Sequence, residues 1–458
     1  MKDIFEFFEK QGFSTPDRSF YKAMELWEAY YTGDVDNFHS YGQYNGIKMV
    51  NRRRRSLNMA KKICEDKADL MLNEKVEWSL PHEESMDFLK DVLDKNNFQT
   101  LSNQLLERAN ALGTCAFVEI FNSGEIVIDY VNGKNIYPLS WEGDHITQCA
   151  FASLKHMNGE KYIYIHMHLL EDREYVIKNH LLKYEKGKLI EESVEDILGI
   201  SETIYTKSPL PFFQIIKPNT ANHILSPSPM GISAFSGALD ILQGIDTIYD
   251  SFINEFDLGK KRIFIDSSLA QVSMGEDGTK LTPVFDTNDI CFYGLSGLRE
   301  SGELIKEVNM ELRIEEHISA LNANLSLLSA KCGLGRHFYS FEKTGLKTAT
   351  EVISENSDLF RKIKKDEIIL RKALMDLAKA VIYMGMHFLH KNISWKGISV
   401  YFDDSIIEDS RKIKEDALTE RNAGLISDAR YFEETRNMDK DTALAFTKEM
   451  NGQIKMKN

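Results

Sequence analysis

Two long helical segments that flank a short insert of strands constrain the fold of this chain most strongly. From Met230 to Leu258, apolar residues recur at the spacing of one helix face, with acidic and polar residues between them. Pro229 stands where the first turn of a helix tolerates proline. Gly259 and the cations that follow it suit the C-terminal end of a helix. With a rise of about 1.5 Å per residue, such a helix spans roughly 40 Å.

A β-rich insert and a second helix follow. Three runs of strand length stand between loops: RIFIDSS at 262–268, TPVFD at 282–286 and DICFYGL at 289–295. From Val308 to Cys332, a second apolar stripe at helical spacing predicts another helix. The predicted order is therefore helix, small β insert, helix.

A loop and a third, longer helix come next. Residues Gly333 to Gly345 interrupt the helical pattern, and Thr348–Glu351 then has the pattern of a capping box, in which side chains satisfy backbone amides of the first turn. The helix that starts there continues to Leu389. Because so long a helix rarely stays straight, we expect a bend near Gly385 or Lys364.

The N-terminal half joins helices to an antiparallel meander. We expect helices over residues 16–32, 56–73 and 84–112, the last with a break at residues 96–97. The period then changes to that of strands, with hairpin turns predicted at residues 122–124, 158–159 and 186–187. Several prolines end this half, so we predict a module boundary near residue 228. With one more strand at 399–404 and short helices over 407–450, the fold class is α+β.

Composition narrows the class of protein. The chain has 458 residues, of which 43% are hydrophobic and 28% charged, and this is typical of a folded protein with more than one module. Its net charge of −14 means that nucleic acid should not bind the surface generally, so any contact with DNA has to be local. We predict no secretory signal and no transmembrane segment. Five widely spaced cysteines without a CxxC pair favour a reducing compartment and no structural zinc.

Residues with catalytic or metal-binding chemistry do not form a convincing motif. His166 and His168 alternate along one strand and therefore share a face, but no third metal ligand has fitting spacing, so a surface-exposed pair is the favoured interpretation. The run Glu315–His317 lacks the second histidine of a zinc protease, and GEDGTK at 275–280 is too short for a phosphate loop. We therefore predict no catalytic residue, no cofactor and no metal.

A run of four arginines, Arg52 to Arg55, is the most basic stretch of the chain. It could bind phosphate. A solvated charge run, or a strip of ion pairs between subunits, is the favoured alternative. The aromatic residues between Phe235 and Phe256 stand at helical spacing, which is typical of core or subunit packing rather than of a platform for stacking bases.

Four stretches of the sequence resemble phage portal proteins, of the type found in long-tailed phages of Gram-positive bacteria. The resemblance spans nearly the whole chain, and its most specific part is the third stretch. The four are LWEAYYTGDVDNFHSY with RRRRSLNMAKKICEDKADLMLNE near the N-terminus, GISAFSGALDILQGIDTIYDSFINEFDLGKKRIFID in the middle, CGLGRHFYSFEKTGLKTATEVISENSDLFRKIKK after it, and RNAGLISDARYF in the tail.

This resemblance implies a ring of subunits, dodecameric in the family, at one vertex of the viral capsid. Double-stranded DNA passes through its centre. The implied partners are the large subunit of the terminase, head-completion and connector proteins, and capsid and scaffolding proteins. The implied location is the virion, after assembly in the cytoplasm of the host bacterium, with no contact to a membrane.

The order of elements, compared with that of the family, implies a portal-like subunit with an α/β wing. Its parts are residues 1–228 as the wing, 229–258 as the first stem helix, 259–306 as the clip, 307–332 as the second stem helix, 333–347 as the tunnel loop, 348–404 as a long bent helix that returns to the wing, and 405–458 as a helical crown.

Two sets of cations are the site residues that the resemblance implies. The DNA-facing set on the tunnel loop is Arg336, His337, Lys343 and Lys347. The set on the clip is Lys260, Lys261 and Arg262. An acidic wall with few cations suits a channel, because each strong phosphate contact would add affinity for DNA and slow its passage.

Two other classes of function compete with this interpretation. A non-enzymatic helical scaffold or adaptor would need sustained heptads, yet the long helices are interrupted by the β insert and the loop. A DNA-processing enzyme would need an acidic metal-binding cluster and a nucleotide loop, neither of which we can identify in the sequence.

Overall fold

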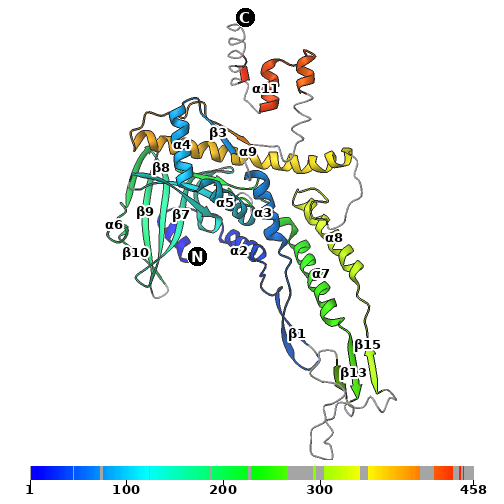
Figure 1. Cartoon of the computed structure of the whole chain (residues 1–458). Coiled ribbons are helices and arrows are strands. Elements are labelled where there is room, and N and C mark those ends of the chain that lie inside the picture. The colour runs from blue at the N-terminus through cyan, green and yellow to red at the C-terminus, as the bar shows by residue number, and fades with distance from the viewer. Residues whose placement is uncertain are drawn as a thin grey trace, which may run out of the picture.

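The structure, a computed structural model, has a broad body from which a narrow arm projects (Figure 1). The arm is residues 239–331, and the body consists of the helices and sheets before it together with the long helix that follows it. The fold is a mixture of helices and strands, in agreement with the predicted α+β class. The residues that the structure describes are 2–44, 46–72, 76–122, 124–185, 188–224, 228–266, 292–295, 304–340, 349–402, 417–436, 443, 444 and 447.

Five helices make up the first part of the body: α1 (Lys2–Lys10), α2 (Arg18–Thr32), α3 (Met59–Leu72), α4 (Glu83–Lys95) and α5 (Phe98–Leu112). Asp17 caps α2 by accepting a hydrogen bond from the amide of Ser19 at 2.7 Å, and Gly33 ends it in the left-handed conformation. The predicted helices and the break at residues 96–97 are confirmed. Helix α1 was not predicted, and neither was a hairpin of β1 (Ser40–Tyr44) and β2 (Met49–Arg53), which lies between the first two predicted helices.

An antiparallel sheet forms one side of the body. Its order is β10-β9-β8-β7-β6, and β11 pairs with β9. The strands are β6 (Ile136–Glu142), β7 (His145–Met157), β8 (Glu160–Glu171), β9 (Glu174–Glu185), β10 (Lys188–Glu192) and β11 (Thr203–Ser208), with α6 (Val194–Leu198) before β11. A second sheet has the order β12-β4-β5, from β4 (Cys115–Asn122), β5 (Glu125–Asn132) and β12 (Phe213–Ile216). The predicted meander is confirmed.

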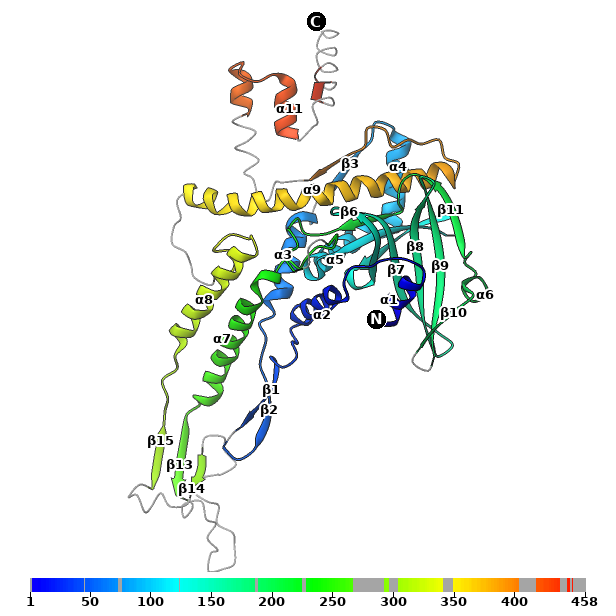
Figure 2. The same cartoon turned by 180° about the vertical axis from the view of Figure 1, so that it is seen from behind.

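Helix α9 (Ala349–His387) runs across the body above the sheets (Figures 1 and 2). Its inner face lies in a core that it shares with α4, α5 and β4. The predicted bend is wrong, because the helix is continuous through Lys364 and Gly385 and is drawn as one rod. Gly385 has a different role: a Cβ there would lie 2.5 Å from Cε1 of Phe88, so glycine lets α4 approach α9. After α9, β16 (Ser399–Phe402) pairs with β3 (Val76–Ser79).

The arm consists of α7 (Leu239–Leu258), α8 (Ile314–Lys331) and a sheet of order β14-β13-β15 at their far end. The strands are β13 (Arg262–Asp266), β14 (Phe292–Leu295) and β15 (Ile305–Val308). The predicted first helix begins too early, because residues 230–235 are non-helical and lie buried in the body. The predicted second helix also begins too early, since Val308 belongs to β15 and α8 starts at Ile314. The predicted strand at 282–286 lies outside the described residues.

Two short helical segments of the tail are described, residues 417–422 and α11 (Asp428–Arg436), and they agree with the short helices expected there. Most of the remaining tail lies outside the described residues. In the part of the chain that the structure describes, we find no helix with the length and hydrophobicity that crossing a membrane requires.

Candidate functional site

The arm is held together by polar contacts between α7 and α8. Arg313, which precedes α8, donates from Nε and Nη2 to the two carboxylate oxygens of Glu255 at 2.9 and 2.8 Å. This two-pronged hydrogen bond lowers the pKa of Glu255 to about 2. One turn further along α8, Nε2 of His317 lies 3.1 Å from the hydroxyl of Ser251. The two helices therefore form a paired unit with a fixed register.

The end of α7, at Gly259, lies close to Leu312 in the segment that leads back into α8. A Cβ on Gly259 would lie 2.4 Å from Cδ2 of Leu312 and 2.6 Å from the carbonyl oxygen of Glu255, so only glycine fits between the end of α7 and the segment that joins β15 to α8. The sequence had suggested Gly259 as a helix end, and the structure adds a packing reason for this residue.

The three cations predicted for the clip lie where α7 passes into β13, and each has a partner in its own chain. Lys260 lies 3.5 Å from Asp257, and Lys261 lies 2.6 Å from Glu307 of β15. The guanidinium of Arg262 lies over the ring of Tyr293 on β14. Their role as clip residues stays a prediction. Their charges are largely balanced at this junction of helix and sheet.

Two of the four cations predicted to face DNA, Arg336 and His337, are exposed in the segment directly after α8. Tyr339 anchors this segment, since its hydroxyl donates to Asp66 of α3 at 2.6 Å and its amide donates to Ser329 at 3.3 Å. The other two, Lys343 and Lys347, lie outside the described residues, as does the predicted capping box at Thr348–Glu351. The described part of the predicted tunnel loop, residues 333–340, is thus fixed near its end by Tyr339, which contacts α3 and α8.

The arginine run Arg52–Arg55 divides between two tasks. Arg54 donates to the carbonyl of Phe38 at 2.6 Å and stacks over the ring of Phe38, while Arg52 and Arg53 are exposed. Arg55 fastens the end of the β1–β2 hairpin to one face of α7 by contacts with three residues: Asp250, Asn254 and Asp257. Arg53 also lies 3.4 Å from Asp34, so three of the four arginines contact their own chain and the run is not simply solvated. The alternative of ion pairs between subunits stays a prediction.

A buried polar cluster that the sequence did not predict ties α7 to the body. Asp246 of α7 accepts hydrogen bonds from the hydroxyl of Ser56 at 2.9 Å and from the amide of Leu57 at 2.7 Å. Its carboxylate also lies 3.0 Å from Nε2 of His39. No spacing rule connects His39 with Asp246, which lies 207 residues later, so no sequence signal could have identified the pair.

The expected surface-exposed histidine pair is wrong: His166 and His168 are buried in β8, and their rings contact each other through Nδ1 and Nε2 at 3.1 Å. Phe151 stacks on His166, and Phe213 packs against His168. Burial lowers the pKa of His166 to about 4 and that of His168 well below its ordinary value. The pair stays buried because β12 and its Phe213 cover this face of the sheet.

The basic run Arg361–Lys365 helps to hold α9 against the body. Asp366 is buried beside two lysines: its carboxylate lies 3.2 Å from Nζ of Lys362 and 3.7 Å from Nζ of Lys67. The amide of Asn219 donates to the same carboxylate at 2.9 Å. Part of the basic run therefore neutralises a buried acid rather than facing a phosphate.

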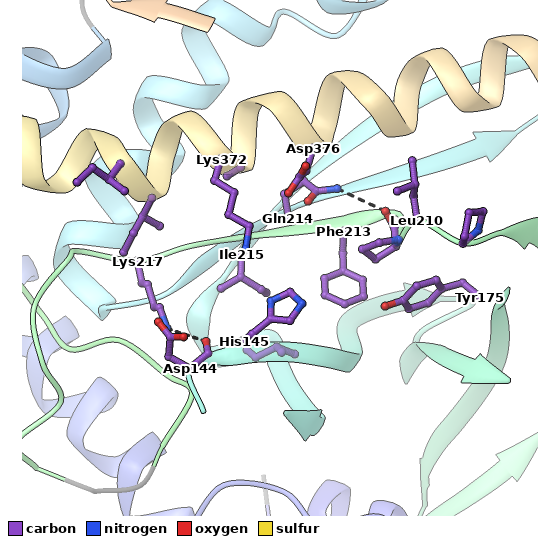
Figure 3. A pocket seen from close by; sticks show the side chains of 16 residues that line it. Asp144, His145, Tyr175, Leu210, Phe213, Gln214, Ile215, Lys217, Lys372 and Asp376 are labelled. Atoms are coloured by element: carbon purple, nitrogen blue, oxygen red, sulfur yellow. Dashed lines mark hydrogen bonds and ion pairs between the residues drawn. The ribbon is translucent and has the colours of Figure 1, made fainter. Parts of the chain in front are cut away.

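A pocket of about 440 Å³ lies between α9 and the strands beneath it. Figure 3 shows Lys372 extending from α9 toward Ile215, and Lys217 pointing toward Asp144. Lys217 donates to the carbonyl oxygens of Asp144 and Pro229, both at 3.0 Å, and burial lowers its pKa. Its ammonium group is thus already satisfied by the chain, and we assign no ligand to this pocket.

The described residues contain neither an assembled metal site nor a reactive thiol. These residues contain no group of three or more histidine, cysteine, aspartate or glutamate side chains that could hold a metal ion. Four of the five cysteines are described, and Cys64, Cys115, Cys149 and Cys332 are free thiols in the core. Burial raises the pKa of each of them, so they stay protonated.

Comparison with known proteins adds one strong match. A protein-family model described as "Phage portal protein, SPP1 Gp6-like" matches residues 16–456. Among solved structures, the chain is similar to a chain of "Virion of native gene transfer agent (GTA) particle", at 11% identity over 81% of this chain and 88% of that chain, with a TM-score of 0.38. It is also similar to a chain of "Neck of empty GTA particle computed with C6 symmetry", at 10% identity over 82% and 89%, with a TM-score of 0.42. A comparison with the curated proteins finds no match. At such low TM-scores, only the family match bears on identity.

Proposed function

The chain belongs to the SPP1 Gp6-like family of phage portal proteins and serves as the portal at a capsid vertex. We propose that its copies close into a dodecameric ring and that double-stranded DNA passes through this ring. The observation that carries this proposal is the family match, which covers residues 16–456. The family is structural rather than enzymatic, and we assign no catalytic residue. The absence of a metal cluster from the described residues is compatible with that role.

In the proposed ring, α7 and α8 form the stem, the β14-β13-β15 sheet forms the clip, the body forms the wing, and the tail helices form the crown. The arm supports this assignment, because it is a paired helical unit that projects from the body and ends in a small sheet (Figure 1). The bond between Arg313 and Glu255 gives the stem a fixed register, which identical copies need if they are to repeat the same contact around a ring.

The proposed channel contacts DNA weakly. Its contact residues are Arg336, His337, Lys343 and Lys347, on the loop between α8 and α9. A net charge of −14 keeps most of the surface repulsive to phosphate, so a few cations can guide the duplex without holding it. Strong binding would oppose movement, because each neutralised phosphate adds salt-dependent affinity.

Partner proteins complete the proposal. The large subunit of the terminase, and later the head-completion and connector proteins, dock at the sheet at the end of the arm, close to Lys260, Lys261 and Arg262. Capsid and scaffolding proteins surround the body. Assembly takes place in the cytoplasm of the host bacterium, and the finished ring stays in the virion.

Electron microscopy of the purified protein tests the ring. The expected image in negative stain is a closed ring with a central channel, and mass photometry of the same sample gives the number of subunits. A Glu255→Gln/Arg313→Gln variant removes the stem contact, and we expect fewer closed rings from it than from the wild type. A protein that stays monomeric at every concentration and salt strength would overturn the proposal.

A further inference from the structure

We propose that the β1–β2 hairpin of one subunit packs on the α8 flank of the next subunit. The hairpin is residues 40–53. The α8 flank is defined by five exposed apolar residues of the arm: Leu304, Ile305, Met310, Ile314 and Ile318. The inference rests on the proposed ring and adds to it the surfaces through which neighbouring copies meet.

The hairpin exposes apolar side chains that a water-soluble surface does not need. Tyr44, Ile47 and Met49 gather at its tip, and Ile47, at 86% exposed, is the most exposed large apolar side chain of the described residues. Both strands are exposed along nearly their whole length. An isolated two-stranded hairpin is marginally stable in water, so this one needs a covering partner to keep its shape.

The base of the hairpin, in contrast, is fixed. The guanidinium of Arg54 lies 4.2 Å from the ring centre of Phe38 and 4.8 Å from that of Tyr41. Directly after the hairpin, the amide of Arg55 donates to Asp250 of α7 at 3.1 Å. The hairpin is therefore held at a set position beside α7. This lowers the conformational entropy that the hairpin loses when a partner binds.

The α8 flank carries the complementary features. Its exposed apolar residues extend from the start of β15 into the first two turns of α8. Two exposed carboxylates, Glu311 and Glu315, lie among them. The hairpin supplies the opposite charge at Lys48 and Arg52. Apolar side chains bordered by opposite charges fit a specific, moderately stable interface.

The hairpin and α8 lie on opposite sides of α7 in the same subunit. In Figures 1 and 2, α7 lies between the hairpin and α8, and the hairpin reaches the height at which the lower end of α7 meets the sheet. A subunit therefore cannot place its own hairpin on its own α8 flank. Two different surfaces on opposite sides produce a head-to-tail contact, and head-to-tail contacts generate rings when the rotation closes. The charge complementarity selects a second copy of this chain as the occupant.

Cysteine cross-linking tests the contact. Met49→Cys and Ile314→Cys are combined in one chain that also carries Cys291→Ser, and assembled rings are treated with a short bis-maleimide. We expect a ladder of covalent oligomers on a denaturing gel. A mixture of the two single variants should give covalent dimers and no larger product, which would prove that the link joins different subunits. The matched control pairs Met49→Cys with Leu154→Cys, an exposed position on β7, and should give no ladder.

A charge exchange provides the second measurement. Arg52→Glu should weaken each contact between subunits by about twofold to fivefold, the range of one exposed ion pair, and should therefore lower the fraction of protein in rings. Adding Glu315→Arg should restore the fraction, and circular dichroism checks that each variant is folded. Rings without the cross-linked ladder would overturn the hairpin contact and leave the portal function intact. A wild-type chain that forms no ring would overturn both.

Discussion

His39 and Asp246 meet in a buried contact that joins the body to the arm, with Nε2 of the histidine 3.0 Å from Oδ2 of the aspartate. The amide of Val35 donates to Nδ1 of the same ring at 2.7 Å, so Nδ1 carries no proton and Nε2 has to be the donor to Asp246. The imidazole is therefore neutral, and the carboxylate accepts from three donors: His39, Ser56 and Leu57.

Replacement of Asp246 should destabilise the protein strongly. Asp246→Ala leaves three donors without their acceptor in a site where the aspartate is 7% exposed, and each buried donor that loses its acceptor costs about 1 to 3 kcal/mol. We expect the free energy of unfolding to fall by about 3 kcal/mol, measured as a lower midpoint in urea and a lower Tm. Asp87→Ala, an exposed aspartate on α4, is the control and should change either value little. Equal stability of the two variants would mean that the cluster does not hold the arm.

The buried histidine pair should make the protein sensitive to mild acid. The pKa of His166 in the folded chain is about 4, below the ordinary value of 6.5, so the unfolded chain binds more protons between these values. The free energy of unfolding should fall by up to about 1.4 kcal/mol per pH unit for each such histidine as pH drops from about 6.5 toward 4. Thermal unfolding between pH 7 and pH 5 measures this loss.

Two variants separate the pair from other acid effects. His168→Phe keeps an aromatic ring against Phe213 and removes one titrating group, so its Tm should fall less between pH 7 and pH 5 than that of the wild type. His156→Gln changes an exposed histidine on β7 and should leave the pH dependence unchanged. The same slope in all three proteins would refute the assignment.

Glu119 should have the opposite pH dependence. It is 0% exposed on β4, its carboxyl oxygens accept no hydrogen bond of normal geometry among the described residues, and burial, only partly opposed by the nearby Gln214 side chain, raises its pKa well above the ordinary value of 4.5. Because the pKa is raised in the folded chain, the free energy of unfolding is not reduced by Glu119 below about pH 4.5 and falls as pH rises above that value. Glu119→Gln should therefore raise the Tm at pH 8, and the gain should shrink toward pH 5. Glu125→Gln, at an exposed position on β5, is the control and should give no gain at either pH.

Local patterns predicted the elements that depend on local chemistry. The helix that ends at Gly33, the break between α4 and α5, and the hairpins of β7 with β8 and β9 with β10 all follow from capping, turn and period signals within a few residues. The same signals identified helix, insert and helix in the arm. Recognition of the family then came from the order of these elements.

Features that depend on distant partners could not be predicted. Residues 230–235 have a helical pattern, yet they are buried in the body in a non-helical conformation. The alternation in β8 showed correctly that His166 and His168 share a face, but nothing local indicated that β12 would cover that face. The role of Arg55 depends on three residues of α7, which are about two hundred positions away.

The loop between α8 and α9 provides the last prediction, which rests on the proposed channel. Deletion of residues 343–347 removes Lys343 and Lys347 and keeps the anchor between Tyr339 and Asp66, so the stem and body should assemble as before. We expect rings of normal appearance in negative stain and a reduced amount of nuclease-protected DNA in a packaging reaction. Lys343→Gln/Lys347→Gln, which keeps the length of the loop, tests whether charge or length is responsible. Loss of the rings on deletion would show instead that the loop is needed for assembly.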